Sequence, residues 1–484
     1  MRILMVSEDL PGDQVGGLGK HVVTLANCLL RHGHDVEILG RNDRNDLSQP
    51  DDREDRNDHN DHNDHNDHND HNDHNDHNDR DKRSQSDDRE DRYDRDDHDR
   101  SDHDLAHDDH DWARRIGFEG RLRKGFGFAR PGWKEARMGL FNPLKRPWFA
   151  RRIARAIDRH APGFDVVHYH GHLPMTGLYV GAHLNFVQTR HDQGSECLTH
   201  LRFVAGAVCA NMVAGDCSVC IRRDAGPLRR AVTALAVDDY RSLAARAFAR
   251  RKTVFVSDFL RRNFLRAVPD ADLSKSRVIH NIVDYPRLRA IAAAAPEPRP
   301  GEVLLAGRID AGKGFAEFLD AAAGRLPAHA RVTIVGDGPL RAALARRHAG
   351  PRIRFVGWQD HAATLALAAR AQLCVVPSVC EEACSSTVLE ALALGRGCLA
   401  LARGGTPELL RYQRYPGQLG LAVTMPDLVT LLTRRLAQPV QRVAPAASFG
   451  ADAGVLLPTF LELYAEPADL LDRHLHLEQR RHPG

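Results

Sequence analysis

Two glutamates, Glu382 and Glu390, stand eight positions apart around the start of a predicted helix. The apolar run at 373–377 reads as a buried strand ending at a proline, and the apolar spacing from Ser386 predicts a helix that stops at Gly395. A helix N-terminus suits a phosphate, because it offers free backbone N–H groups and the positive end of the dipole. Carboxylates accept hydrogen bonds from adjacent sugar hydroxyls. The spacing therefore favours a ligand with phosphates in its middle and hydroxyls at both ends, such as a nucleotide sugar. A capped helix with two surface glutamates is the alternative.

Two cationic side chains, Arg308 and Lys313, follow a second predicted strand at 303–306 and precede a helix. Cationic groups that leave the end of a strand can hold a diphosphate through charge-assisted hydrogen bonds. Ordinary surface charge would look the same in sequence. We interpret the pair as a second part of the same phosphate site.

The N-terminus predicts a strand–helix–strand unit with a glycine loop. A strand at 2–7 is followed by a loop at 11–20, a helix at 21–32 that ends at Gly33, and a strand at 36–39. The loop glycines, which include Gly16 and Gly17, let a phosphate approach the backbone. They do not spell Gly-x-Gly-x-x-Gly, so a dinucleotide fingerprint is not supported, and a tight turn packed on the helix remains the alternative.

The Glu-x7-Glu element after a strand ending in Pro-Ser resembles the signature of retaining glycosyltransferases of family 4, which have the GT-B fold. Residues 307–314 resemble the "GRxxxxKG" element of that family, residues 336–339 its "GDGP" turn and residues 404–408 its "GGxPE" element. The match at 277–284 is looser, because Ile282 replaces a glycine.

The resemblance implies roles for individual residues. The catalytic residues would be Glu382, His191, Arg308 and Lys313. His191 lies at the C-terminal end of a predicted strand at 185–192, where it would touch the donor sugar. The residues that would bind the donor are Gly16, Gly17, Gly307, Arg308, Lys313, Gly336, Gly357, Glu382, Ser386, Thr387 and Glu390. Glu390 would hold the ribose and Glu382 the sugar. Transfer would need no catalytic metal, because Arg308 and Lys313 would neutralise the leaving diphosphate.

The same resemblance implies an α/β fold with two Rossmann-like domains facing a cleft. We expect an N-terminal, acceptor-side domain at 1–285, a linker at 286–301 and a C-terminal, nucleotide-sugar donor domain at 302–450. Residues 451–484 would form a terminal helical segment that crosses back to the first domain. We expect its helix at 458–472, kinked or broken at Pro467.

A low-complexity insertion at about 44–111 interrupts the first domain. The triplet Asn-Asp-His repeats from Asn57 to Asp79, and the tract has almost no apolar residues, so we expect it to be disordered. Its histidines can bind divalent metal loosely. A repeat expansion with no selected role is the alternative.

Residues 112–159 carry fourteen lysines and arginines against three acidic residues, with eight Phe and Trp side chains interleaved. This composition suits an anionic membrane surface or an anionic lipid-linked acceptor, and Arg151–His160 predicts an amphipathic basic helix. A solvated basic face with inward aromatics is the alternative. We expect no nucleic-acid partner, because no recognised binding motif accompanies the charge.

Four of the nine cysteines cluster in sequence, and Cys217 and Cys220 have the Cys-x2-Cys spacing of a metal knuckle. Four thiolates would complete a zinc tetrahedron. The candidate site consists of Cys197, Cys209, Cys217 and Cys220, and free thiols in a lid-like insertion are the alternative.

These features predict a hexosyltransferase that moves a sugar, with retention, from a UDP- or GDP-sugar to a glycan or lipid-linked acceptor in cell-envelope or extracellular polysaccharide synthesis. A sugar-nucleotide isomerase on the same fold and an inactive nucleotide-sugar-binding homologue are the alternatives. No secretory signal and no run of 18 apolar residues is seen in the 484 residues, which predicts a cytoplasmic enzyme with a peripheral site on the inner face of the plasma membrane.

Overall fold

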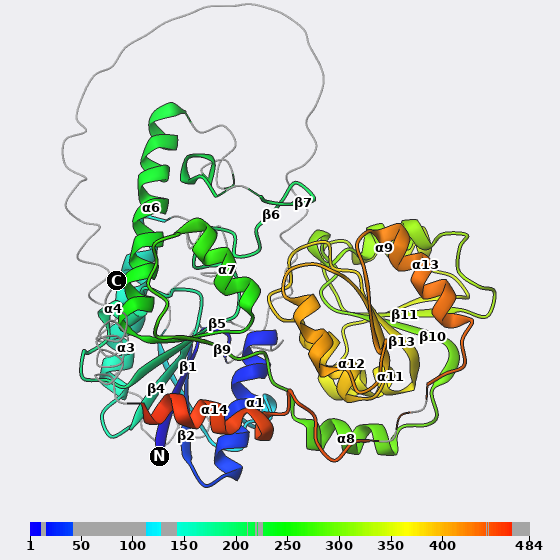
Figure 1. Ribbon diagram of the computed structural model, residues 1–484, viewed down its shortest axis with the longest axis horizontal. Coiled ribbons are helices and arrows are strands. Elements are labelled where there is room, and N and C mark those ends of the chain that lie inside the picture. Colours follow the sequence, from blue (N-terminus) through cyan, green and yellow to red (C-terminus); the bar gives the residue numbers. More distant parts are fainter. Residues whose placement is uncertain are drawn as a thin grey trace, which may run out of the picture.

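Two fully parallel sheets organise the chain, one from each half of the sequence (Figure 1). The computed structural model describes residues 1–10, 16–41, 113–126, 143–210, 212–217, 220, 226–441, 443 and 445–466. Parallel strands are buried on both faces, which explains the near-continuous apolar runs that mark them in the sequence. The predicted α/β fold with two Rossmann-like domains is confirmed.

Each sheet is built almost entirely from strands of one domain. In spatial order, the first sheet contains β3 (Arg121–Phe126), β2 (Asp35–Arg41), β1 (Arg2–Ser7), β4 (Val166–His170), β5 (Phe186–Arg190), β8 (Lys252–Phe255) and β9 (Ser276–Val278). The second sheet contains β12 (Ile353–Gly357), β11 (Arg331–Val335), β10 (Arg299–Ala306), β13 (Ala371–Val376), β14 (Gly397–Leu401) and β15 (Leu419–Ala422). A separate antiparallel hairpin pairs β6 (Phe203–Val204) with β7 (Ala207–Val208).

Helices cover both faces of the first sheet, because alternate residues of each strand point to opposite sides. Ile3 and Met5 of β1 pack in the cluster that contains α1 (Gly17–Arg31) and α14 (Ala453–Ala465). Leu4 and Val6 pack in the cluster that contains α3 (Arg146–His160) and α6 (Pro227–Arg250). The short helix α4 (Thr176–Tyr179) lies on this second side, and α7 (Asp258–Ala267) follows β8.

The second sheet is covered in the same way. One side carries α9 (Phe315–Ala322), α10 (Arg341–His348) and α13 (Met425–Leu436). The other side carries α8 (Tyr285–Ala294), α11 (His361–Arg370) and α12 (Ser386–Ala393). Three short 3-10 helices complete the described elements, namely η3 (Ala214–Cys217), η4 (Ala311–Lys313) and η5 (Thr406–Tyr412).

The chain passes between the two domains twice, and the two passages pair with each other. Val283 donates a backbone hydrogen bond to Ala451 at 2.9 Å and accepts one from Ala453 at 2.9 Å. Helix α14 then lies beside α1 on the first domain (Figure 1). The predicted return of the C-terminal helix to the first domain is confirmed.

The bounds of several elements differ from the prediction. Helix α1 begins at Gly17 rather than at residue 21, and α3 begins at Arg146 rather than at residue 151. The terminal helix spans Ala453–Ala465 instead of 458–472, with Pro458 inside it. Pro467, the expected kink, lies outside the described residues.

The stretch 286–301, assigned to a linker, contains most of helix α8 and the first residues of β10. Its sequence is a good helix former, because Asp284 accepts from the backbone N–H of Arg287 at 3.1 Å, Pro286 occupies the first turn and alanines follow. The prediction gave too much weight to the prolines. The Asn-Asp-His repeat and residues 127–142 of the basic, aromatic segment lie outside the described residues.

Candidate active site

The C-terminal ends of the strands in the two sheets face one cleft, and an ion pair lies in it. Lys313, the last residue of η4, places its Nζ 2.6 Å from Oε1 of Glu382 in the loop after β13. The same oxygen accepts a hydrogen bond from Oγ of Ser378 at 2.6 Å. In sequence both charged residues follow predicted strands of the second domain, and the structure brings them into direct contact.

Two glycines allow the loops that carry this ion pair to approach each other. Gly314 follows Lys313 with φ at +69°, and a Cβ there would lie 2.0 Å from the carbonyl oxygen of Pro377. Gly404 has φ at +58°, and a Cβ there would lie 2.3 Å from the carbonyl oxygen of Glu382. Both positions combine a left-handed backbone with close packing, so only glycine fits. The predicted "GGxPE" element thus acts as a backbone support for Glu382.

The ion pair fixes the charge state of both partners. Burial alone would lower the pKa of Lys313 and raise the pKa of Glu382, because it penalises the charged forms. Their mutual attraction outweighs burial, so the pKa of Lys313 is raised and that of Glu382 is lowered. The lysine therefore stays cationic and the carboxyl stays ionised at neutral pH.

A cavity of about 270 Å³ surrounds this pair and reaches both domains; we call it the Glu382 cavity. Most of the predicted site residues meet there. Its lining includes Gly17 and His191 from the first domain and Gly307, Lys313, Glu382, Ser386 and Thr387 from the second. Helix α12 begins at Ser386, so its N-terminal turn forms part of the wall.

A neighbouring cavity of about 360 Å³ contains Glu390; we call it the Glu390 cavity. Oε1 of Glu390 lies 2.8 Å from Nε2 of His361 on α11. Burial would raise the pKa of this carboxyl, but the contact with His361 lowers it below its ordinary value. The other predicted residues along this cavity are Gly16, Gly307, Arg308, Gly336, Ser386 and Thr387.

Two predicted residues are placed less centrally. Arg308 lines the Glu390 cavity, but its side chain is 74% exposed, and its Nε lies 3.6 Å from the Asp310 carboxylate. Gly357 does not line either cavity; its carbonyl accepts a hydrogen bond from the N–H of Gly336 at 2.8 Å. It supports the turn at Gly336 from behind, while its neighbour Trp358 lines the cavity.

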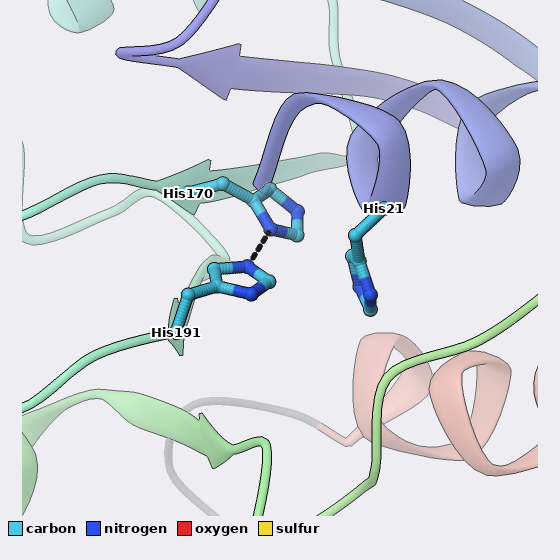
Figure 2. A group of neighbouring side chains, drawn as sticks. All are labelled: His21, His170 and His191. Carbon is cyan, nitrogen blue, oxygen red and sulfur yellow. Dashed lines mark hydrogen bonds between the residues drawn. The ribbon is translucent and has the colours of Figure 1, made fainter. Parts of the chain in front are cut away.

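Behind His191 lies a cluster of histidines that the sequence analysis did not assemble (Figure 2). Nδ1 of His170, at the end of β4, lies 3.1 Å from Nε2 of His191. His21 from α1 faces both rings, and one ring nitrogen from each of the three lies within 4.8 Å of the others. The histidines at the end of the predicted strand that contains His170 indicated part of this cluster. His21 could not be predicted as a member, because a histidine buried on a helix looks like a core residue in sequence.

Burial keeps these imidazoles uncharged. It lowers the pKa of His21 to about 4 and holds the pKa of His170 and His191 well below the ordinary value. A neutral imidazole both donates and accepts a hydrogen bond, which suits a sugar hydroxyl. It is also the form that binds a metal ion.

Asp192, next to His191, is committed to other partners. Its carboxylate lies 2.5 Å from Nδ1 of His172 and 3.4 Å from Nδ1 of His200. Burial would raise its pKa, but these two histidines hold the pKa well below its ordinary value. Asp192 and His191 therefore have different neighbours.

Glu408, the last residue of the "GGxPE" element, has a role that no sequence pattern indicates. The Glu408 carboxylate accepts from the backbone N–H groups of Asp258 at 2.9 Å and Phe259 at 2.7 Å, at the start of α7 in the other domain. It also lies 3.0 Å from Nε2 of His280. An acidic group at a helix N-terminus is favourable, so Glu408 ties the two domains together beside the cleft.

Both halves of the sequence match known family models. Residues 300–438 match the model described as "Glycosyl transferases group 1", and residues 120–287 match the one described as "Glycosyltransferase Family 4". Together the two matches take in more than half of the 484 residues.

Two curated relatives are glycogen synthases from strains CDC 1551 and H37Rv of Mycobacterium tuberculosis. Each is 33% identical over 165 residues, and this alignment spans 33% of the present chain and only 38% of each relative. The solved structure of sucrose-phosphate synthase from Thermosynechococcus elongatus superposes with a TM-score of 0.52 at 18% identity, over 99% of this chain and 98% of that one.

The superposition supports the fold, and the family models account for both domains that build the cleft. The arrangement of two facing Rossmann-like domains with a returning C-terminal helix is the GT-B fold. The two family models, which together match both domains, place the chain in the group 1, family 4 glycosyltransferases.

Proposed function

We propose that this enzyme transfers a sugar from a nucleoside-diphosphate donor, with retention of anomeric configuration. The observation that carries the proposal is the Lys313–Glu382 ion pair, 2.6 Å long, at the N-terminal turn of α12 and in one cavity with His191. A diphosphate fits beside the lysine and the helix N-terminus, and a sugar fits between Glu382 and His191.

The nucleoside would occupy the Glu390 cavity. Oε1 of Glu390 is paired with His361, which leaves Oε2 to accept hydrogen bonds from the ribose hydroxyls. The base would lie along Trp358, whose side chain is half exposed and lines this cavity. In this arrangement the ribose lies at Glu390 and the sugar lies at Glu382. The phosphates lie between them, at the N-terminus of α12.

The leaving diphosphate would be stabilised by side chains instead of a divalent metal ion. Lys313 already lies in the Glu382 cavity, and the exposed Arg308 lines the Glu390 cavity, where its guanidinium would meet the phosphates. Fixed cations that meet developing negative charge lower the barrier without solvent reorganisation. The acceptor would be a glycan or a lipid-linked sugar of cell-envelope or extracellular polysaccharide synthesis.

Donor binding should raise the melting temperature and depend on Glu390. In a thermal-shift screen with UDP-, GDP- and ADP-sugars, we expect one nucleotide to stabilise the protein, because a ligand at 100 times its Kd adds about 2.7 kcal/mol. Glu390→Ala should remove most of this shift, and Asp427→Ala, at the exposed start of α13, should keep it. An unchanged shift in Glu390→Ala would place the ribose elsewhere.

Product analysis separates the three candidate activities. With the stabilising donor and a set of glycan and lipid-linked acceptors, a glycosyltransferase forms a new glycoside and releases the nucleoside diphosphate. An isomerase changes the donor without any acceptor, and an inactive homologue binds the donor without consuming it. Either of the last two results would overturn the proposal.

Contact with an anionic membrane would use the exposed side of α3. Its apolar side is buried, whereas Arg151, Arg152 and Arg155 are exposed, as is half of the Trp148 side chain. Basic residues near an anionic surface contribute about 1 kcal/mol each. Within the described residues, no helix has the length and apolar character needed to cross a bilayer.

We therefore expect the protein to float with anionic vesicles at low salt and to be released by high salt. Changing Arg151, Arg152 and Arg155 together to Gln should lower vesicle affinity roughly a hundredfold, given about 1 kcal/mol per charge. Changing Arg346, Arg354 and Arg411, which are exposed on the second domain, serves as the matched control. Equal recovery with neutral and anionic vesicles would exclude this docking mode.

A further inference from the structure

Four cysteines from one short segment meet at a single small cavity. Cys197, Cys209, Cys217 and Cys220 all line a space of about 20 Å³, which is large enough for one small ion or water. All nine cysteines of the chain are described, and all nine are free of disulfide bonds. The proposed transfer reaction uses none of these four thiols.

The segment that carries them has little core of its own. Within the described residues between 197 and 226, only Leu198 and Ala214 are buried apolar side chains. Its regular structure amounts to the two-residue strands β6 and β7 and the short η3. Small units without a hydrophobic core normally depend on a disulfide or a metal ion.

Its backbone is also held in conformations that need support. His200, Arg202 and Ala205 have positive φ values of 64°, 48° and 51°, and they are the described residues other than glycine that do. Such conformations persist only where surrounding contacts impose them. The cysteines flank this stretch on both sides, so a link between them would impose that shape.

We propose that Cys197, Cys209, Cys217 and Cys220 hold a structural Zn²⁺ ion. Zinc binds four thiolates in a tetrahedron with Zn–S bonds of about 2.3 Å, which puts the sulfur atoms about 3.8 Å from one another. In the structure no three of these four described sulfur atoms lie within 4.8 Å of one another, so binding would draw them closer around the cavity. Binding releases the thiol protons to solvent, and no oxidant or reductant is needed. The Cys217-x2-Cys220 pair supplies the knuckle, and the other two ligands come from before and after the β6–β7 hairpin.

The surrounding charges fit this ion. Zn²⁺ with four thiolates carries a net charge of −2, and two arginines, Arg202 and Arg241, line the same cavity while being almost fully buried. Nη2 of Arg241 donates to Sγ of Cys217 at 3.7 Å, which is the kind of N–H to sulfur contact that orients a zinc thiolate. Glu196 also lines this cavity.

The site also supports one wall of the Glu382 cavity. His200 and Leu201, which lie between the first two cysteines, line that cavity. Arg146 joins the two regions, because its guanidinium donates to the carbonyl oxygens of Gly194 at 3.0 Å and Leu198 at 2.9 Å. The zinc ion would act as a positioning element for this wall, independent of which sugar is transferred.

The test is the zinc content of the full-length protein after purification in reductant without added chelator. We expect about one zinc per chain by inductively coupled plasma mass spectrometry. Cys217→Ser combined with Cys220→Ser should reduce this to near zero, and Cys28→Ala, a cysteine in α1 outside the cluster, should leave it unchanged. Zinc lost instead in His191→Ala would assign the ion to the histidine cluster and overturn the proposal.

A second measurement does not depend on the folding of a variant. Replacing zinc with Co²⁺ in the wild-type protein should give the strong thiolate-to-cobalt charge-transfer absorption of a four-sulfur site. Metal-free protein with four thiols that react rapidly with Ellman's reagent, a disulfide among the four, or bound iron with iron–sulfur absorption would each overturn the assignment. Metal content and cobalt spectra are independent of sugar transfer, so a negative result leaves the proposed function standing, and the reverse also holds.

Discussion

Replacing Lys313 with alanine is expected to lower turnover by roughly a hundredfold or more, because it removes one fixed cation that stabilises the leaving diphosphate. The structure adds a second reason. Lys313 is the ion-pair partner of Glu382 at 2.6 Å, and its charge keeps the pKa of that buried carboxyl below its ordinary value. Without the lysine the Glu382 pKa rises, so the variant loses a phosphate contact and perturbs the group beside the sugar.

The measurement is kcat and KM from nucleoside-diphosphate release, with the melting temperature as a check on folding. Arg299→Ala is the matched control, since Arg299 pairs with Glu302 at the opposite end of β10, far along the strand from the cleft. Arg308→Ala should also lower turnover about a hundredfold, with less effect on stability because its side chain is largely exposed. Near-normal turnover in Lys313→Ala would remove this residue from the site.

Much of this site follows from sequence because its parts are local. A strand, a glycine-bearing turn and a helix N-terminus occur within a few residues of one another around Lys313 and again around Glu382. Each loop then emerges at the carboxyl edge of a parallel sheet, where ligands bind in α/β folds. The type and the position of these elements were therefore predictable from sequence. It was also predictable that the loops around Lys313 and Glu382 lie in one cleft.

Contacts that join distant segments were not predictable from local patterns. Glu408 caps α7 from the other domain, and that role exists only once the domains are packed. His21 joins His170 and His191 only because the fold places the first turns of α1 beside the residues that end β4 and follow β5. In sequence each of these residues looks like an ordinary buried or charged position, and no pattern indicates which residue it will contact.

The helix in the expected linker shows a different limit. Local signals around Asp284 and Pro286 favour a helix start, but a stretch rich in proline also resembles a connection between domains. The alanines favour the helix because of their high helix propensity. The helix is then stabilised by Leu288, which packs into a buried apolar cluster with residues of both domains. The residues of this stretch favour a helix, whereas the prediction of a linker relied on its position between the two domains.

Replacing Glu382 with glutamine should lower kcat roughly a hundredfold while changing donor affinity much less, because the amide keeps the shape and removes the charge. In the structure Oε1 of Glu382 is engaged by both Lys313 and Ser378, which leaves Oε2 for the sugar hydroxyls. Glutamine can still hydrogen-bond a hydroxyl. It cannot supply negative potential to a sugar ring that becomes positive as the diphosphate departs.

This expectation rests on a front-face mechanism. Glu382 lies on the same side as Lys313 and the N-terminal turn of α12, where the diphosphate would bind, whereas a nucleophile must attack from the opposite side. The wall that the first domain contributes to the Glu382 cavity holds His191, and the nearby Asp192 is bound by His172 and His200. We therefore expect the acceptor oxygen to bond to the anomeric carbon on the face that the phosphate oxygen leaves, with the acceptor proton passing to that phosphate oxygen.

Intact-mass spectrometry with a slow fluorinated donor distinguishes this route from a two-step displacement. A double displacement through a carboxylate would leave a glycosyl group covalently attached to the protein between the steps. The front-face route leaves no such adduct, and the product keeps the anomeric configuration of the donor. Ser242→Ala, on the exposed side of α6 away from the cleft, is the control for Glu382→Gln. An adduct on Glu382 or Asp192 would rule out the front-face mechanism, and so would an inverted product, because the diphosphate leaves from the face that the acceptor is expected to use.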